Sequence, residues 1–233
     1  MDNRRASSPL LRHEFERVPP ALVAQASAFA ASILADVAGR RGTLDGRIMP
    51  LSRSTRLAGP AFTVEIRPGD NLMIHAAMAL AQPGDVLVID GKSDRSCAVM
   101  GAIMITTCKK LGLGGVVIDG AHRDTEDLLA LGFPVYSVGS NPNGPTKSVP
   151  GRINGPISCG GVAVHPGDLV VGDGDGVVVI ERDTVASLLA PAAQKVTDER
   201  ARIEDITSGR QIRPAWLDSA LRAAGLLQDG ETL

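Results

Sequence analysis

The chain has 233 residues, of which 44% are hydrophobic and 21% charged, an ordinary composition for a globular protein that buries a core. Aromatic residues make up only 3%, so the core must consist of Val, Ile, Leu and Ala, and a stacking platform for single-stranded nucleic acid is not expected. With 24 basic and 26 acidic residues, the net charge of −2 offers no overall field for a polyanion, which argues against nucleic acid as a partner.

The cysteines and the apolar runs indicate the compartment. Cys97, Cys108 and Cys159 form no CxxC pair, so we expect free, buried thiols in a reducing environment. No apolar run approaches the roughly 18 residues of a membrane span. The N-terminus carries charges where a signal peptide would be apolar. These features predict a soluble, cytoplasmic protein with no membrane partner.

The first third of the chain predicts an arm, a helix and a strand. Residues 1–19 end at a Pro-Pro pair and are expected to form an N-terminal arm. Over residues 21–40, apolar side chains recur at helical spacing, which predicts one helix. An apolar stretch at 61–66 is followed by Pro68-Gly69, which predicts a strand that ends there.

Helices and buried strands then alternate up to residue 137. The expected helices cover 71–81, 98–111 and 123–131, and the expected strands cover 85–90, 115–119 and 134–137. Continuous apolar strands separated by helices of about ten residues are typical of parallel βαβ units. The chemistry of such units belongs at the carboxyl ends of the strands.

The last part of the chain predicts small β elements and then helices. Short β runs at 162–164, 169–171 and 177–180 lie between Pro-Gly and Asp-Gly turns, which indicates a β-meander or part of a barrel. "GDGDG" at 172–176 lacks the ligand spacing of a calcium loop and is expected to be a hairpin turn. A long helix is predicted from Thr184 to about Ser208, kinked or restarted at Pro191, and a short helix near residues 217–227.

Most titratable residues show no catalytic spacing. Neither a zinc motif nor a GxSxG turn occurs among the four histidines and the serines. His75 lies on an apolar helix face and is expected to be a hydrogen-bonded structural residue. Lys109 and Lys110 fall in the last turn of a predicted helix, where solvated cations favour the helix dipole.

The exception is "GVVIDGAHRDTEDL", residues 115–128, in which Arg123-Asp124 follows a buried strand and opens a helix. Arg supplies a rigid fork for a carboxylate, and Asp supplies a hard oxygen for a cation such as Mg²⁺. An ordinary ion pair at a helix N-terminus explains the same composition, with Glu126 and Asp127 adding to the favourable dipole. From these residues alone both interpretations stay open.

A second feature favours a binding site. A helix is predicted to start near Gly101, directly after the neighbouring strand, and glycine lets a ligand approach the backbone. The free N–H groups of Ala102, Ile103 and Met104 could hold a carboxylate. In adjacent βαβ units this loop and the Arg123-Asp124 loop would face one crevice.

Four stretches of the sequence together resemble the RraA-like family. They are "GDVLVIDG", "GVVIDGAHRDTEDL", "GFPVYSVGSNPNGPTK" and "GGVAVHPGDLVVGDGDGVVVI". That family includes 4-hydroxy-4-methyl-2-oxoglutarate/4-carboxy-4-hydroxy-2-oxoadipate aldolases and the regulator of ribonuclease E activity. The resemblance covers residues 20–210 and leaves 1–19 as the arm and 211–233 as a C-terminal tail. Its signature corresponds here to Gly101 followed, after 21 residues, by Arg123-Asp124 and Asp127.

The resemblance implies an α/β fold, a three-layer β/β/α swivelling domain, assembled as a homotrimer or homohexamer. In the aldolases of this family, the residue matching Asp124 binds Mg²⁺ or Mn²⁺, and the residue matching Arg123 holds pyruvate. The backbone amides of residues 102–104 would hold the pyruvate carboxylate. A Glu on a neighbouring subunit's C-terminal helix reaches the metal's waters; Glu199 is the nearest match here, ahead of Glu204.

Two positions separate the possible functions within the family. Ala102 stands where some aldolases have an acid, so the substrate of this chain is open. Regulator members lack the acid of the Arg-Asp pair, so Asp124 favours an enzyme.

The resulting hypothesis is a divalent-metal-dependent, class II-like aldolase. It would cleave a 4-hydroxy-2-oxo dicarboxylic or tricarboxylic acid to pyruvate through a metal-stabilised enolate, with oxaloacetate decarboxylation as a side activity. The alternatives are a non-catalytic regulator that binds a ribonuclease, and another metal-enolate lyase or decarboxylase. The expected catalytic residues are Arg123 and Asp124. The expected substrate-binding residues are Gly101, Ala102, Ile103, Met104 and Arg123, and the expected metal ligands are Asp124 and Glu199.

Overall fold

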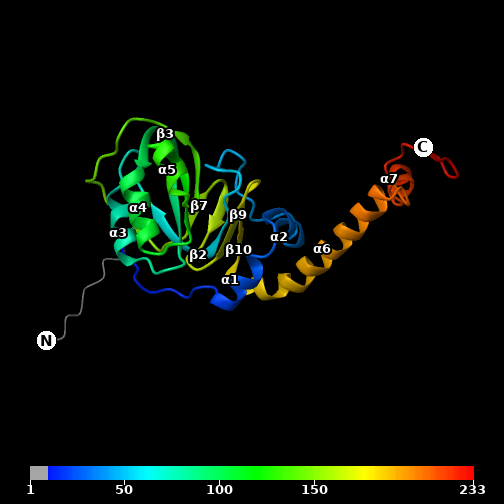
Figure 1. The fold of residues 1–233 in the computed structure, drawn as a ribbon, viewed down its shortest axis with the longest axis horizontal. Helices are drawn as coiled ribbons and strands as arrows, with labels where there is room; N and C mark the ends of the chain where they lie inside the picture. The colour runs from blue at the N-terminus through cyan, green and yellow to red at the C-terminus, as the bar shows by residue number, and fades with distance from the viewer. Residues whose placement is uncertain (1–9) are drawn as a thin grey trace. The chain divides into compact units, whose positions relative to one another are not determined.

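Four parallel strands form the centre of an eight-stranded mixed sheet (Figure 1). In the computed structural model, which describes residues 10–233, they are β2 (Leu57–Glu65), β3 (Val86–Met100), β4 (Gly115–His122) and β5 (Val135–Ser140). The antiparallel strands of this sheet are β1 (Met49–Pro50), β6 (Arg152–Ile153), β9 (Leu169–Asp173) and β10 (Gly176–Ile180). A separate hairpin consists of β7 (Ile157–Cys159) and β8 (Val162–Val164).

Three helices connect the parallel strands and cover one face of the sheet (Figure 1). They are α3 (Leu72–Leu80), α4 (Ala102–Lys110) and α5 (Thr125–Leu131). Successive strand residues point to opposite faces, so Leu87 and Ile89 pack in the cluster under the helices, whereas Val86 and Val88 pack in a second cluster. The second cluster joins the other face of the sheet to strands β7–β10. The expected α/β fold with helical, sheet and β-hairpin layers is thereby confirmed.

The alternating helices and strands of residues 71–137 are confirmed, but several boundaries differ, most of all the end of β3, which lies at Met100 and not at residue 90. The helix expected from residue 98 begins only at Ala102, because Ala98 and Met100 pair with Ala121 and His122 of β4. The same pairing extends β4 three residues beyond the predicted end at 119. Both loops of interest therefore start further along the chain than the hydrophobic pattern indicates.

The single helix predicted for residues 21–40 is wrong. Two short helices, α1 (Pro20–Ala26) and α2 (Ala31–Val37), are bent by 106°. The backbone N–H of Ala31 donates to Oδ2 of Asp173 (2.8 Å), the last residue of β9. This contact spans 142 residues, which apolar periodicity does not encode. The turn between β9 and β10 confirms the hairpin interpretation of "GDGDG".

The described end of the predicted arm packs against the sheet. The ring of Phe15 meets the ring of Phe62 edge-on, with 5.8 Å between centroids. The guanidinium of Arg17 donates to both carboxylate oxygens of Asp85, at 2.7 and 2.9 Å. Residues 10–19 thus contribute to the core, and residues 1–9 lie outside the described part of the chain.

The C-terminal helices are close to the prediction. Helix α6 (Val185–Thr207) follows a 3₁₀ turn (Arg182–Thr184), and α7 is Leu217–Ala223. Helix α6 runs through Pro191 without a restart. One compact unit ends at Ala192 and a second covers Ala193–Leu233, whereas the boundaries at residues 19 and 210 stay predictions.

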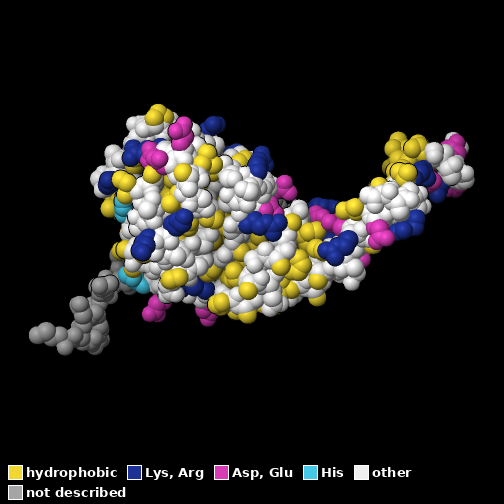
Figure 2. Space-filling view, in the orientation of Figure 1, with side chains coloured by type: hydrophobic (Ala, Val, Ile, Leu, Met, Phe, Trp, Pro, Cys, Tyr) yellow, Lys and Arg dark blue, Asp and Glu magenta, His cyan; other side chains and the backbone are white. Residues whose placement is uncertain are grey.

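The surface and the cysteines agree with a globular α/β protein. On the face drawn in Figure 2, basic and acidic side chains lie interspersed. Within residues 10–233 no single helix is long and apolar enough to cross a membrane, and only the bent α1–α2 pair would qualify by combined length and composition. All three cysteines are free and buried, as expected, and burial raises the pKa of Cys108 to about 12.

Asp119, which the sequence places at the end of a strand, is a buried structural residue. Its carboxylate accepts hydrogen bonds from Arg47 (3.1 and 3.3 Å), from Ser93 Oγ (2.9 Å) and from the N–H of Gly160 (2.8 Å). It therefore fastens three segments to the middle of the sheet. Arg47 also pairs with Asp45 (3.1 Å), but that carboxylate is exposed.

We expect Asp119→Asn to lower the free energy of unfolding by about 2 kcal/mol, since a buried charged hydrogen bond to Arg47 is lost. Asp45→Asn removes the exposed partner of the same guanidinium and should change stability by less than about 0.5 kcal/mol. Urea denaturation of the two variants measures both values. An equal decrease in the free energy of unfolding for the two variants would show that the burial of Asp119 does not determine how much it stabilises the protein.

Candidate active site

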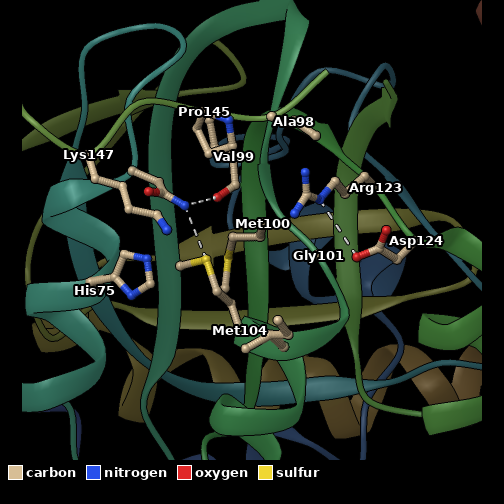
Figure 3. A pocket seen from close by; sticks show the side chains of 13 residues that line it. His75, Ala98, Val99, Met100, Gly101, Met104, Arg123, Asp124, Pro145 and Lys147 are labelled. Carbon is tan, nitrogen blue, oxygen red and sulfur yellow. Dashed lines mark hydrogen bonds and ion pairs between the residues drawn. The ribbon is translucent and has the colours of Figure 1, made fainter. Parts of the chain in front are cut away.

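The loops after β3 and β4 border one cavity of about 200 Å³. Five predicted or neighbouring residues of these loops lie in its wall, namely Gly101, Ile103, Met104, Arg123 and Asp124. The rest of the wall comes from α3 and from the loop that contains Gly144, Pro145 and Lys147, and His75 and Lys147 lie across from Arg123 (Figure 3). This volume lies below the roughly 300–1,000 Å³ typical of pockets for drug-sized molecules, so the cavity suits a small ligand.

Asp124 joins the two loops. Its Oδ2 accepts a hydrogen bond from the backbone N–H of Ala102 (2.9 Å). The backbone of Asp124 is left-handed, with φ 61°, a conformation that Asp tolerates better than most residues but that is still unusual outside glycine. Such backbone positions occur preferentially at binding sites. Asp124 is held in this conformation at the point where a ligand would meet both loops.

Arg123 lies next to this carboxylate without a close ion pair. Its Nε is 3.7 Å from Asp124 Oδ2, and its side chain is 42% exposed. Its backbone N–H donates to the carbonyl of Met100 (3.0 Å), which fixes where the side chain starts. A Cβ at Gly144 would lie 2.9 Å from Nη1, so the glycine leaves room for the guanidinium. The fork of Arg123 thus remains open to an anion.

The atoms around Gly101 leave no space for a side chain at this position. Its φ of −150° is available to any residue, but a Cβ there would overlap Oδ2 of Asp124 and lie 2.9 Å from Cγ of Arg123. A side chain at this position would push the Arg-Asp pair out of the cavity wall. Gly101 therefore lets the two loops meet, whereas the role predicted from the sequence was to let a ligand approach the backbone.

The first turn of α4 offers two open amides. Ala102 donates its N–H to Asp124, so the expectation that all three amides of residues 102–104 await a ligand is wrong for Ala102. The N–H groups of Ile103 and Met104 have no intrahelical acceptor, as at any helix start, and meet no other acceptor within residues 10–233. They are the groups able to hold a carboxylate.

His122 fixes the end of β4 immediately before Arg123. Its buried ring lies 2.8 Å from Ser137 Oγ through Nδ1 and 3.1 Å from Thr125 Oγ1 through Nε2. Burial lowers the pKa of His122, which favours the neutral ring. Sequence spacing gave no reason to choose His122, although it directly precedes the Arg-Asp pair.

Two further side chains, which the sequence analysis did not assign to the site, also border the cavity. His75 was expected to be a hydrogen-bonded structural residue, but its side chain is exposed and forms no hydrogen bond within residues 10–233. Lys147 extends from the facing loop (Figure 3). Partial burial and the charge of Lys147 both lower the pKa of His75. The pair makes this side of the cavity polar and basic.

The predicted metal ligands fall in different units. Asp124 presents Oδ1 without a hydrogen-bond partner in the described chain, and its side chain is 37% exposed. Glu199 belongs to the second unit, where it pairs with Lys195 (3.0 Å). No group of three or more acidic, His or Cys residues suited to a metal occurs within residues 10–233. A single carboxylate still fits Mg²⁺, which commonly keeps several waters and takes one or two protein carboxylates.

The fold and the cavity define an α/β protein with a small cavity at the carboxyl edge of a parallel sheet, lined by Arg123, Asp124 and the first turn of α4. Residues 23–179 match the model of the RraA-like family, described as Aldolase/RraA. The chain belongs to this RraA-like family.

Relatives of the chain bear both kinds of name found in the family. A Halalkalibacterium halodurans protein named "Putative 4-hydroxy-4-methyl-2-oxoglutarate aldolase" is 42% identical over 178 residues, covering 76% of this chain and 85% of that protein. The crystal structure of Streptomyces coelicolor RraAS2, of the RNase ES inhibitor RraA family, has a TM-score of 0.75 and 28% identity, covering 81% and 99% of the two chains. The RNA-processing inhibitor RraA from Thermus thermophilis has a TM-score of 0.60 and 26% identity, covering 64% and 91%.

We expect Gly101→Ala to separate Asp124 from the N–H of Ala102, because the new methyl group would overlap Oδ2 of Asp124. A crystal structure of the variant measures this distance directly, and loss of the hydrogen bond should cost about 1 kcal/mol of stability. Gly46→Ala is the control, since a Cβ there meets no atom within 4 Å. An unchanged Asp124 in Gly101→Ala would contradict the steric role of the glycine.

Proposed function

We propose that the protein is a lyase that cleaves a 4-hydroxy-2-oxo dicarboxylic or tricarboxylic acid and releases pyruvate. The observation that carries this proposal is the single cavity in which Arg123, Asp124 and two open amides meet. A relative with an aldolase name, 42% identical to this chain, supports the same class of reaction. The active form would be a homotrimer or homohexamer in the cytoplasm.

The substrate's 2-oxo acid end fits the wall formed by α4 and Arg123. Its carboxylate would accept hydrogen bonds from the N–H groups of Ile103 and Met104, at the positive end of the helix dipole. The guanidinium of Arg123 would lie beside the 2-oxo oxygen. Ala102 leaves this end without the additional acid that some family aldolases carry.

Cleavage transfers charge to the 2-oxo oxygen, where Arg123 acts. A water molecule would accept the proton of the C4 hydroxyl, the C3–C4 bond would break, and its electron pair would form the C2–C3 double bond of an enolate. C4 would leave as a carbonyl group, and return of a proton from water to C3 would yield pyruvate. Arg123 stabilises the enolate oxygen, a contribution of about 3 kcal/mol for one well-placed donor. Loss of carbon dioxide from oxaloacetate would produce the same enolate as a side reaction.

Asp124 would hold a divalent cation, Mg²⁺ or Mn²⁺, and Glu199 of a neighbouring subunit would contact the waters around it. When bound, the cation supplies Lewis-acid stabilisation of developing negative charge. Asp124 is suited to this role because its Oδ1 is open while its Oδ2 is already fixed by Ala102. Its negative charge also keeps Arg123 near the cavity.

The main rival is a protein-binding regulator of a ribonuclease, and a different metal-enolate lyase or decarboxylase is a further one. The names of the two solved RraA structures favour the regulator. Asp124 favours an enzyme, because a binding surface for a protein has no need of a carboxylate held on a left-handed backbone at a small cavity.

We expect pyruvate release from 4-hydroxy-4-methyl-2-oxoglutarate to require Mg²⁺ or Mn²⁺ and to stop in EDTA. Arg123→Ala should lower kcat/KM at least a hundredfold, in line with the loss of one charged donor. Coupling to lactate dehydrogenase measures the pyruvate formed. Absence of metal-dependent pyruvate from every 4-hydroxy-2-oxo acid and from oxaloacetate would reject the lyase, and inhibition of a ribonuclease would then support the regulator.

The variant Asp124→Asn removes the negative charge of Asp124 but keeps its hydrogen bond to Ala102, so it tests these two contributions separately. Asn tolerates left-handed backbone and can still accept the hydrogen bond from Ala102, so the variant should fold like the wild type. It should nevertheless lose turnover and bind Mn²⁺ at least tenfold more weakly, because a neutral amide is a poor ligand for a hard cation. Glu126→Gln, on the exposed first turn of α5, is the control and should retain both properties.

A further inference from the structure

The two charged residues between β4 and α5 form a short bridge whose two ends are fixed. Figure 3 shows Arg123 and Asp124 side by side at the cavity. Before them, β4 pairs with both neighbouring strands up to His122. After them, the N–H of Leu128 donates to the carbonyl of Asp124 (3.0 Å) at the start of α5. The conformation of this bridge therefore decides where the two charges lie.

His122 places a polar ring at the end of a strand whose buried side chains are mostly apolar. Its side chain is buried, with 4% exposed. Four other buried side chains of this strand are apolar, namely Val116, Val117, Ile118 and Ala121. Burying a polar ring costs free energy unless its nitrogens are hydrogen-bonded, so an apolar residue would fill this position at a lower cost. The partners of the ring explain why a histidine lies here.

The ring of His122 connects β5 to the first residue of α5. Nδ1 lies 2.8 Å from Oγ of Ser137, in β5, and Nε2 lies 3.1 Å from Oγ1 of Thr125. The hydroxyl of Thr125 has no other hydrogen-bond partner within residues 10–233. Threonine near a helix start commonly bonds to nearby backbone instead, so the contact with the ring is particular to this turn.

The direction of these hydrogen bonds follows from the groups around the ring. The carbonyl oxygen of Gly139 can only accept and lies 3.5 Å from Ser137 Oγ, so the hydroxyl of Ser137 donates to Gly139 and its oxygen accepts from Nδ1. Burial lowers the pKa of His122 and so favours the neutral ring. In a neutral ring with its proton on Nδ1, Nε2 is an acceptor, and the hydroxyl of Thr125 donates to it.

The contact between the ring and Thr125 closes a short loop around Asp124. His122 ends the strand and Thr125 begins the helix, so both sides of the contact belong to regular structure. Only Arg123 and Asp124 lie between them, and the chain has to turn within these two residues. Asp124 makes this turn with a left-handed backbone, at φ 61°.

We propose that His122 is the positioning residue for Asp124, because its ring ties Thr125 back to the end of β4 and thereby keeps the backbone of Asp124 left-handed. The bond from the N–H of Ala102 (2.9 Å) then holds the carboxylate from the other side. His122 does not line the cavity, so it touches no ligand there and acts through Asp124. The inference rests on the proposed function only for the cation that Asp124 would hold.

Two substitutions at Thr125 separate the effect of its hydroxyl from that of its size. Thr125→Val keeps the shape but removes the donor, and a crystal structure should show Oδ2 of Asp124 moved away from the N–H of Ala102. Mn²⁺ binding, measured by electron paramagnetic resonance, should weaken about tenfold, as is usual when a group that orients a metal ligand is removed. Thr125→Ser keeps the hydroxyl and should retain both properties. Thr106→Val, on α4, is the matched control, because the exposed Thr106 hydroxyl forms no hydrogen bond within residues 10–233.

Two substitutions at His122 test the ring itself. The side-chain amide of Asn lies where Nδ1 lies in histidine, whereas the amide of Gln reaches the position of Nε2. His122→Asn should therefore behave like Thr125→Val, and His122→Gln should behave like the wild type. In the double variant His122→Asn/Thr125→Val, Mn²⁺ binding should be no weaker than in either single variant, because both changes remove the same contact.

Three results would overturn the positioning role. The first is that Thr125→Val and His122→Asn lower the unfolding temperature but leave Asp124 and Mn²⁺ binding unchanged, which would show that the ring only stabilises the fold. The second is an equal loss of Mn²⁺ binding in Thr125→Ser and Thr125→Val. The third is an additive loss in the double variant, which would show that the two residues act independently.

The crystal structures separate this inference from the proposed lyase. If the wild type binds no Mn²⁺ and releases no pyruvate, the lyase is rejected, and the position of Asp124 in Thr125→Val still decides the role of His122. If the wild type releases pyruvate but Asp124 stays in place in Thr125→Val, the lyase stands and the role of His122 is rejected.

Discussion

The hydrogen bond from the N–H of Ala102 to Asp124 is the contact on which the candidate site depends. It links the start of α4 to the end of β4. Both points lie at the same edge of the sheet, because the adjacent strands β3 and β4 are parallel. Without it, Asp124 would have little reason to keep a left-handed backbone. Because Gly101 leaves the space in which this bond forms, a missing side chain is as important to the site as the charged ones.

The parallel core could be predicted from the sequence because its signals are local. The strands that contain Leu87 and Val117 begin as continuous apolar runs, and each is followed by a helix, as predicted. Contacts between distant segments could not be predicted in the same way. The break before Ala31 depends on Asp173, and the late start of α4 depends on pairing with β4. Apolar periodicity describes which face a residue buries but contains no information about its distant partner.

The candidate site was predictable to the extent that its residues form a short motif. Arg123 and Asp124 were identified, and they do share a cavity with the first turn of α4. The sequence analysis did not identify the side of the cavity that contains His75 and Lys147. These two residues are 72 positions apart, and neither belongs to a sequence motif. Asp119 shows that an acid at the predicted end of a strand can also be a buried structural residue, since only its distant partners reveal this role.

The two sides of the cavity are supported by different parts of the fold, and this has consequences for specificity. Arg123 and Asp124 are fixed by the two central strands, so changes there would disturb the sheet edge as well as the chemistry. Lys147 belongs to a loop that is attached to α3 mainly through Asp70. A loop of this kind can change its residues without moving the strands. The architecture therefore allows the loop side of the cavity to vary while the side formed by Arg123 and Asp124 stays the same.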